Sequence, residues 1–168
     1  DLLVEYRKHK DDPRINEKVK EMAEELGPGN LMPGILPRLA QYELTLLDIY
    51  ETHRGSCEYA VFANKCWPSF QTEFGFVPCY VNSRLTAMGI PVACEVDIYG
   101  ALSEYIGTCI SQQPVTLLDI NNTVPADLYE NEIKDTQPYQ LNEVFMGFHC
   151  GNTPICRLKN AAMKYQLI

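Results

Sequence analysis

The sequence predicts an α/β protein in which helices cover both faces of a parallel sheet. Two observations support this fold class. Short apolar runs of strand character alternate with apolar residues at helical spacing between residues 58 and 122, and a strand, helix, strand, helix, strand order with short connections is typical of a parallel sheet. The chain has 168 residues, 46% of them hydrophobic, which is enough to bury a core.

Two helices are expected before the first strand. Apolar residues at helical spacing predict one helix over residues 13–26 and a second over about 35–52. The segment GPGNLMPG, residues 27–34, is rich in glycine and proline and separates them. The second helix is denser in apolar residues, so it is expected to be largely buried.

The alternating region begins with a short buried strand, EYAVFANK at residues 58–65, and the loop KCWPSFQTEFG leaves it. Helical spacing then predicts a helix over residues 76–88, which Gly89 is expected to close as a C-cap. A second strand, residues 90–96, follows. The next helix has one apolar stripe, formed by Ile98, Ala101, Leu102, Tyr105, Ile106 and Cys109.

QPVTLLDINN, residues 113–122, is the third strand candidate and would complete the parallel sheet. The segment TVPADLYENEIKDTQPYQLNE that follows is polar, acidic and interrupted by prolines, without a clear period. We interpret it as a long loop or a domain boundary. An apolar strand, EVFMGFH at residues 143–149, comes after it.

Charge and cysteine content narrow the classes of partner and compartment. The 14 basic and 22 acidic residues leave a net charge of −8, so the chain lacks the basic surface that binds nucleic acid or anionic lipid. No apolar stretch approaches the roughly 20 residues that span a bilayer. Seven cysteines without a C-x-x-C pair indicate reduced thiols and a cytoplasmic location. Because the chain starts without Met and ends without an obvious cap, we expect a segment of a longer protein.

Acidic residues end two of the predicted strands. Glu95 ends the second strand and Asp119 the third, and a right-handed crossover places these ends on one edge of the sheet, where ligands bind. Two neighbouring carboxylates repel one another unless a proton or a cation separates them. With His149 at the end of the last strand they would suit Mn²⁺, Mg²⁺ or Co²⁺. Asp97 instead occupies an N-cap position.

Each of these residues also has a purely structural interpretation. Glu95 is compatible with a cap or surface residue, Asp119 with a turn, and His149 with a hydrogen-bonded structural histidine. Trp67 and Gln71 leave the first strand on the same edge, so they are candidates for substrate binding, although packing also explains Trp67. A Cys150–His149 nucleophile is disfavoured, since adjacent residues on a strand point to opposite faces.

Four motifs in order, KCWPSFQ, MGIPVACEVDIYGALSEYIG, LLDINN and FHCGNTP, resemble the L-fucose isomerase and L-arabinose isomerase superfamily, most of all its fucose-isomerase-like members. The resemblance covers roughly residues 57–154, and residues 89–107 are its most specific part. It implies a middle α/β domain over residues 1–112 and the start of a β-rich C-terminal domain over residues 113–168. In this family the second acidic ligand opens the next domain, so the third strand would leave the sheet.

The resemblance also implies a function. Such enzymes interconvert aldoses and ketoses with a divalent ion, usually Mn²⁺, and Glu95, Asp119 and His149 would hold it. Glu95 and Asp119 would in addition exchange protons with a monosaccharide through a cis-enediol. A further ligand histidine and the substrate-covering domain would lie outside this chain, so the 168-residue piece is expected to be inactive. The resemblance also implies that the full-length protein is a homo-oligomer.

Two other classes of function stay open at this point. One is a non-catalytic sugar-binding or assembly domain that keeps the isomerase fold. The other is a cysteine hydrolase. Intact Glu95, Asp119 and His149 count against the first, and the placement of Cys150 counts against the second.

Overall fold

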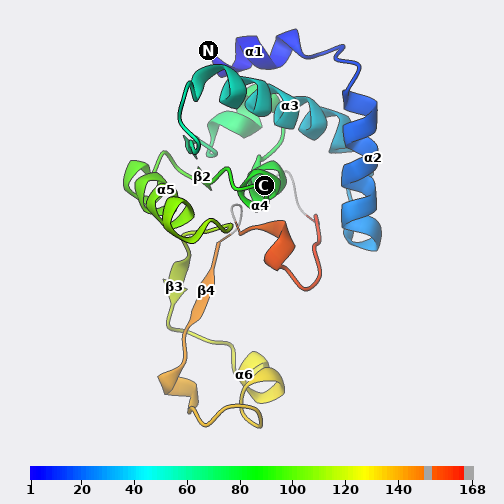
Figure 1. Ribbon diagram of the computed structural model, residues 1–168. Helices are drawn as coiled ribbons and strands as arrows, with labels where there is room; N and C mark the ends of the chain where they lie inside the picture. The colour runs from blue at the N-terminus through cyan, green and yellow to red at the C-terminus, as the bar shows by residue number, and fades with distance from the viewer. Residues whose placement is uncertain (150–152, 165–168) are drawn as a thin grey trace.

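The computed structural model describes residues 1–149 and 153–164, and it shows an α/β core from which a strand ladder extends (Figure 1). Single 3₁₀ turns lie at Gly27–Gly29, Pro33–Ile35, Leu141–Glu143 and Ile155–Arg157, and a π turn at Phe70–Phe74. The helices and strands are α1 (Leu2–Lys8), α2 (Ile15–Leu26), α3 (Leu36–His53), β1 (Phe62–Ala63), α4 (Cys79–Ala87), β2 (Val92–Ala93), α5 (Ile98–Ser111), β3 (Asp119–Asn121), α6 (Ala126–Glu132) and β4 (Met146–Phe148).

Helix α3 is the centre of the core. As predicted, α2 and α3 follow the apolar spacing of their sequences, and α3 is buried along most of its first half. Helix α1, for which no prediction was made, packs Tyr6 against the same core. Phe70 and Phe74 stack with ring centroids 4.7 Å apart, and Tyr42 of α3 meets Phe70 edge-on at 5.2 Å. Aromatic pairs in these geometries add stability beyond the area they bury.

A buried ion network ties α2, α3 and α4 together. Arg84 of α4 donates from Nε to Oε2 of Glu43 on α3, at 2.6 Å. Its Nη1 also donates to Glu25 of α2 at 2.5 Å, and the Tyr80 hydroxyl donates to the same carboxylate at 2.6 Å. Lys18 lies 3.3 Å from Glu43. Glu43 is therefore fully buried with two cations beside it.

Strands β1 and β2 form the predicted parallel pair. Phe62 is opposite Val92 and Ala63 is opposite Ala93. Both strands are shorter than predicted, with two residues each, because the chain turns sharply after Cys94. Helices α4 and α5 both pack against β2, and Gly89, with φ of 82°, closes α4 as predicted.

The third strand is not part of this sheet. β3 pairs antiparallel with β4, and Asp119 is opposite Phe148 in that ladder. The prediction from alternation, a third parallel strand, is therefore wrong, whereas the departure of this strand that the family resemblance implied is observed. The physical reason is a contact with α5: the Leu117 N–H donates to the side chain of Glu104, so the segment before β3 runs along the helix.

The segment after β3 is not a loop throughout. Helix α6 begins directly after Pro125, which is its N-cap residue. Tyr129 is buried, and its hydroxyl donates to the Tyr139 carbonyl at 2.8 Å, so α6 is fixed to the loop that leads back to β4. Figure 1 shows β3 and β4 extending from the core with α6 at their far end.

Helix α5 buries a different face from the one its apolar residues predict. Of the predicted stripe, only Ala101 is buried, whereas Ile98 is 68% and Leu102 52% exposed. The buried face instead carries Gly100, Ala101, Glu104 and Thr108. The helix thus turns small and polar side chains inward, toward the segment that precedes β3.

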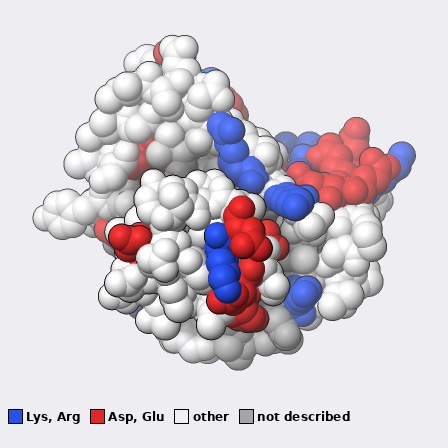
Figure 2. All heavy atoms as spheres, turned by 90° about the horizontal axis from the view of Figure 1, so that it is seen from below, with Lys and Arg blue, Asp and Glu red and all other residues white. Residues whose placement is uncertain are grey.

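The surface carries charged side chains of both signs, with uncharged areas between them (Figure 2). On the face seen in Figure 2, acidic and basic side chains lie beside one another, and broad areas carry neither. Within the part of the chain that the structure describes, no helix has the length and apolar character needed to span a bilayer.

Candidate active site

A pocket of about 140 Å³ lies where β2, α5 and the β3–β4 ladder meet. It brings together Glu95, Asp119 and His149, the three residues that the sequence singles out as candidate metal ligands. The three come from two separate parts of the fold, since Glu95 follows β2 and the other two lie at one end of the ladder. The complete lining consists of Cys66, Ala93, Cys94, Glu95, Asp97, Leu117, Asp119 and His149.

Glu95 reaches the pocket from a tight turn. The Asp97 N–H donates to the Cys94 carbonyl at 3.0 Å, and both central residues of this turn have positive φ, 59° for Glu95 and 57° for Val96. Glycine and asparagine usually occupy such positions, and a β-branched residue rarely does. The Val96 N–H donates to the Asn64 carbonyl at 3.0 Å, which anchors the turn to the end of β1. Strained backbone of this kind tends to occur at functional sites.

Asp97 has the structural role that the sequence predicts. Its Oδ1 accepts the Gly100 N–H at 2.8 Å, so it caps the first turn of α5. The two acids of this segment therefore differ in their bonding: Asp97 is engaged by the helix, whereas Glu95 projects from the turn with its side chain exposed. The same cap fixes the direction in which the turn enters α5.

Asp119 and His149 are neighbours across the ladder. Because Asp119 is paired with Phe148, His149 follows directly after the residue opposite Asp119. Both residues are consequently at the end of the ladder that faces the core. The carboxylates of Glu95 and Asp119 thus come to one pocket by an antiparallel pairing, and not by the crossover on which the sequence prediction was based.

The donor set fits a hard divalent cation. Two carboxylates and one imidazole are the ligand types that Mn²⁺ accepts. Among the residues described, only His9, Asp12 and Asp48 have ligand atoms that all lie within 4.8 Å of one another, so the donor atoms of Glu95, Asp119 and His149 are spaced more widely. Closure onto an ion would require the ladder end and the turn to approach each other.

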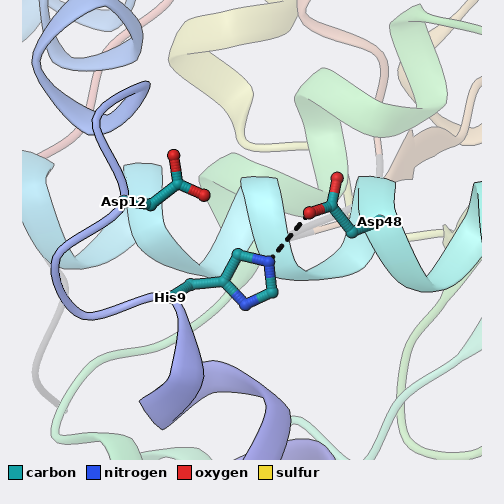
Figure 3. A group of neighbouring side chains, drawn as sticks. All are labelled: His9, Asp12 and Asp48. Atoms are coloured by element: carbon teal, nitrogen blue, oxygen red, sulfur yellow. Dashed lines mark hydrogen bonds and ion pairs between the residues drawn. The ribbon is translucent and has the colours of Figure 1, made fainter.

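The side chains of His9, Asp12 and Asp48 form a cluster (Figure 3), and the guanidinium of Arg14 bridges its two carboxylates. Arg14 Nη2 lies 2.6 Å from Asp12 Oδ2 and 2.7 Å from Asp48 Oδ2, and His9 Nε2 is 2.9 Å from the same Asp48 oxygen. The guanidinium holds the pKa of Asp48 down to about 2. These groups join α1, the turn after it and α3, so we regard the cluster as structural.

The other candidates from the sequence lie elsewhere. Trp67 is 54% exposed, and neither it nor Gln71 lines the pocket, although Cys66 beside Trp67 does. The amide oxygen of Gln71 is buried. Cys150, the candidate nucleophile, lies outside the described residues.

Glu104 is a residue that the sequence reasoning missed. It is 1% exposed, its Oε1 accepts the Leu117 N–H at 2.7 Å, and it stands behind the pocket wall that Leu117 forms. Burial raises the pKa of Glu104, against the lowering effects of the Leu117 N–H and of His149. The sequence contains one signal, since Glu104 lies three residues after Ala101 and therefore near the same side of the helix. It also lies opposite much of the apolar stripe, where a charged residue is expected to be exposed to solvent.

Comparison with known proteins identifies sugar isomerases as relatives of this chain. Each of the relatives described below is a sulfoquinovose isomerase. That of Clostridium sp. (strain MSTE9) is 34% identical over 116 residues, which are 69% of this chain and 22% of the relative. That of Priestia aryabhattai is 39% identical over 54 residues, 32% of this chain and 12% of the relative. That of Alkalicoccus urumqiensis is 45% identical over 47 residues, 28% of this chain and 11% of the relative.

These matches span only part of the relatives, 22% of the Clostridium protein. No model of a protein family matches the chain. No solved structure matches it either. The similarity therefore relates this chain to one portion of a sugar isomerase.

Proposed function

We propose that this chain is the part of an aldose–ketose isomerase that supplies its two acid–base carboxylates, Glu95 and Asp119. The observation that carries the proposal is their presence in one pocket with His149. The relationship to sulfoquinovose isomerases supports the same class of reaction. A monosaccharide in its open-chain form is the substrate class we infer.

The reaction requires a proton to move between two neighbouring carbons. One carboxylate takes the proton from the carbon next to the carbonyl, which gives a cis-enediol, and then returns it to the former carbonyl carbon. The hydroxyl proton moves between the two oxygens over the same steps. Two carboxylates in one pocket provide a base and an acid for these transfers, each worth roughly 10²- to 10⁴-fold in rate.

Glu95, Asp119 and His149 would hold a divalent ion, for which Mn²⁺ is our proposal. When bound, the ion would polarise the carbonyl and stabilise negative charge on the enediol oxygens. The chain's own residues do the rest: the turn at Glu95 and Val96 orients one carboxylate, and the ladder orients the other. Leu117 and Ala93 supply apolar parts of the pocket wall.

Activity assays with a panel of sugars would identify the substrate. The relatives' name suggests sulfoquinovose, and the motif resemblance suggests L-fucose or L-arabinose. Among the described residues, the pocket lining contains no lysine or arginine to bind a sulfonate. For a sulfonated sugar, the cationic contacts would therefore come from other parts of the full-length protein.

The test uses the full-length polypeptide that contains this chain. We expect it to bind Mn²⁺ in metal analysis and to isomerise at least one of the three sugars. Glu95→Gln should lower kcat by at least about 10²-fold while leaving the circular dichroism spectrum and melting temperature unchanged. Glu132→Gln, an exposed acid at the end of α6, is the matched control and should keep full activity. Full activity in Glu95→Gln would refute the catalytic role; absence of both metal binding and turnover would favour a non-catalytic sugar-binding or assembly domain.

A further inference from the structure

The inward face of α5 contacts the segment that carries Asp119 at three successive points. A Cβ on Gly107 would lie 3.0 Å from Val115 Cγ1, and one on Gly100 would lie 2.9 Å from Leu117 Cδ2. Between these two glycines, Oε1 of Glu104 accepts the Leu117 N–H at 2.7 Å. Positions 100, 104 and 107 share one face of the helix. The segment from Val115 to Leu117 therefore runs antiparallel along that face.

We propose that Glu104 is a positioning residue that places Asp119 opposite Glu95 by holding the backbone of Leu117. The inference rests on the proposed function, since it assigns Glu104 a part in that site. Leu117 is two residues from Asp119, and it forms part of the pocket wall itself. Glu104 does not line the pocket, so it acts through the chain segment and not on a substrate.

The burial of Glu104 argues for a specific role. A carboxylate that is 1% exposed loses its hydration, and a leucine or alanine on this face would avoid that loss. A carboxylate oxygen that accepts a backbone N–H compensates part of the loss and fixes the acceptor's position. Its bond to Leu117, one of the lining residues, puts Glu104 directly behind this wall. The two glycines let the segment approach closely enough for the bond to form.

The position has a consequence for the site. β3 starts at Asp119, two residues after the Glu104 bond, so the bond lies at the root of the ladder. If the hydrogen bond between Glu104 and Leu117 is lost, Asp119 and the end of β4 that pairs with it lose their nearest attachment to α5. Both ligands on the ladder side of the pocket would then move relative to Glu95.

The test compares Glu104→Ala and Glu104→Gln in the full-length polypeptide, with Thr108→Val as the control. The glutamine keeps an oxygen that can accept the Leu117 N–H. Thr108 is buried on the same face, and its hydroxyl has no hydrogen-bond partner among the described residues. Three quantities are measured: hydrogen exchange of the amides of residues 115–119, affinity for Mn²⁺ alone, and kcat and KM separately.

We expect Glu104→Ala to speed exchange of the Leu117 amide and to weaken Mn²⁺ binding by about tenfold, the effect of losing one hydrogen bond to a charged group. It should lower kcat more than it raises KM. Glu104→Gln should stay within about threefold of wild type in Mn²⁺ affinity, and Thr108→Val should match wild type.

The results separate this inference from the proposed function. If the wild type binds Mn²⁺ and turns over sugar but Glu104→Ala leaves the affinity and kcat unchanged, the positioning role is refuted and the function stands. If Glu104→Gln falls as far as Glu104→Ala, the bond to Leu117 is not the cause and the inference is also refuted. A wild type that neither binds Mn²⁺ nor isomerises sugar refutes both.

Discussion

Arg84 on α4 and Glu43 on α3 form an ion pair whose carboxylate is completely buried, with Nε 2.6 Å from Oε2. Burial lowers the pKa of Arg84, but the hydrogen bonds and charges of Glu43 and Glu25 outweigh it and leave that pKa above its ordinary value. The pair joins the two helices on which the core is built. Helix α4, which carries Arg84, packs against β2, and the end of β2 leads to Glu95.

Arg84→Met should lower the free energy of unfolding by about 3 kcal/mol, because among the described residues it leaves the buried charge of Glu43 with Lys18 as its one ion-pair partner. Urea denaturation measures the loss. Lys20→Met is the matched control: Lys20 and Glu24 are both exposed and 4.0 Å apart, so removing this pair should change the stability by less than about 0.5 kcal/mol. Equal stability of the two variants would show that the Arg84 network contributes little.

Acid should remove stability that Asp48 provides. The hydrogen bond from Arg14 lowers the pKa of Asp48 from 3.8 to about 2, so the unfolded chain takes up this proton at a higher pH than the folded chain does. The contribution is therefore complete above about pH 4 and disappears as the pH falls toward about 2. Asp48→Asn should flatten the decline of unfolding free energy over that interval, whereas Asp11→Asn, at an exposed neighbour, should not. Parallel curves for Asp48→Asn and wild type would contradict this.

His9 should act in the opposite direction at higher pH. Desolvation lowers its pKa, but the hydrogen bonds to the Glu5 carbonyl and to Asp48 outweigh it, and the pKa rises above 6.5. The stability that protonated His9 contributes is present below pH 6.5 and is lost as the pH rises through the higher pKa of the folded state. His9→Asn should therefore lower the free energy of unfolding more at about pH 6 than at about pH 9. His53→Asn, at an exposed histidine, serves as the control; an equal loss for His9→Asn at both values would refute the expectation.

Val96→Asn should raise the free energy of unfolding by about 1 kcal/mol, because asparagine tolerates the positive φ that valine resists. The Val96 side chain is 44% exposed, so little burial is lost. Val96→Thr keeps the branched Cβ and should change the stability much less. Thermal denaturation distinguishes the two. A Val96→Asn protein less stable than Val96→Thr would show that the turn is not strained by its side chain.

Asp97→Ala should destabilise the protein by about 1 kcal/mol, since it removes the acceptor for the Gly100 N–H at the start of α5. Asp97→Asn retains an oxygen that can cap the helix and should stay close to wild type. Urea denaturation provides the comparison. Were both substitutions equally harmful, the charge of Asp97 and not its capping bond would be what matters.

Local signals in the sequence account for much of the fold. Apolar spacing identifies α2, α3 and α4, Gly89 identifies the end of α4, and the Asp97 cap identifies the start of α5. The parallel pairing of β1 with β2 follows from the helix between them. The helices and their ends depend on residues within one or two turns of each other, which is the range that sequence patterns report, and the strand pairing follows from the order of the elements.

The features that were missed depend on distant contacts. Residues 115–118 form an apolar run that suits a buried strand, but the bond between Glu104 and Leu117 places the run along α5, and no periodicity encodes it. Helix α6 was missed because prolines and acids surround it, while the contact that fixes it joins Tyr129 to Tyr139. The three candidate ligands were found by residue type and strand ends, yet the route that brings Asp119 to Glu95 was not.

Because β3 pairs with β4 and not with the parallel sheet, the pocket lies between the α/β core and the antiparallel ladder. One carboxylate lies on the turn after β2 and the other at the start of β3, so the distance between them depends on the angle between the ladder and the core. Substitutions that change the angle between the ladder and the core should therefore change the distance between the two carboxylates.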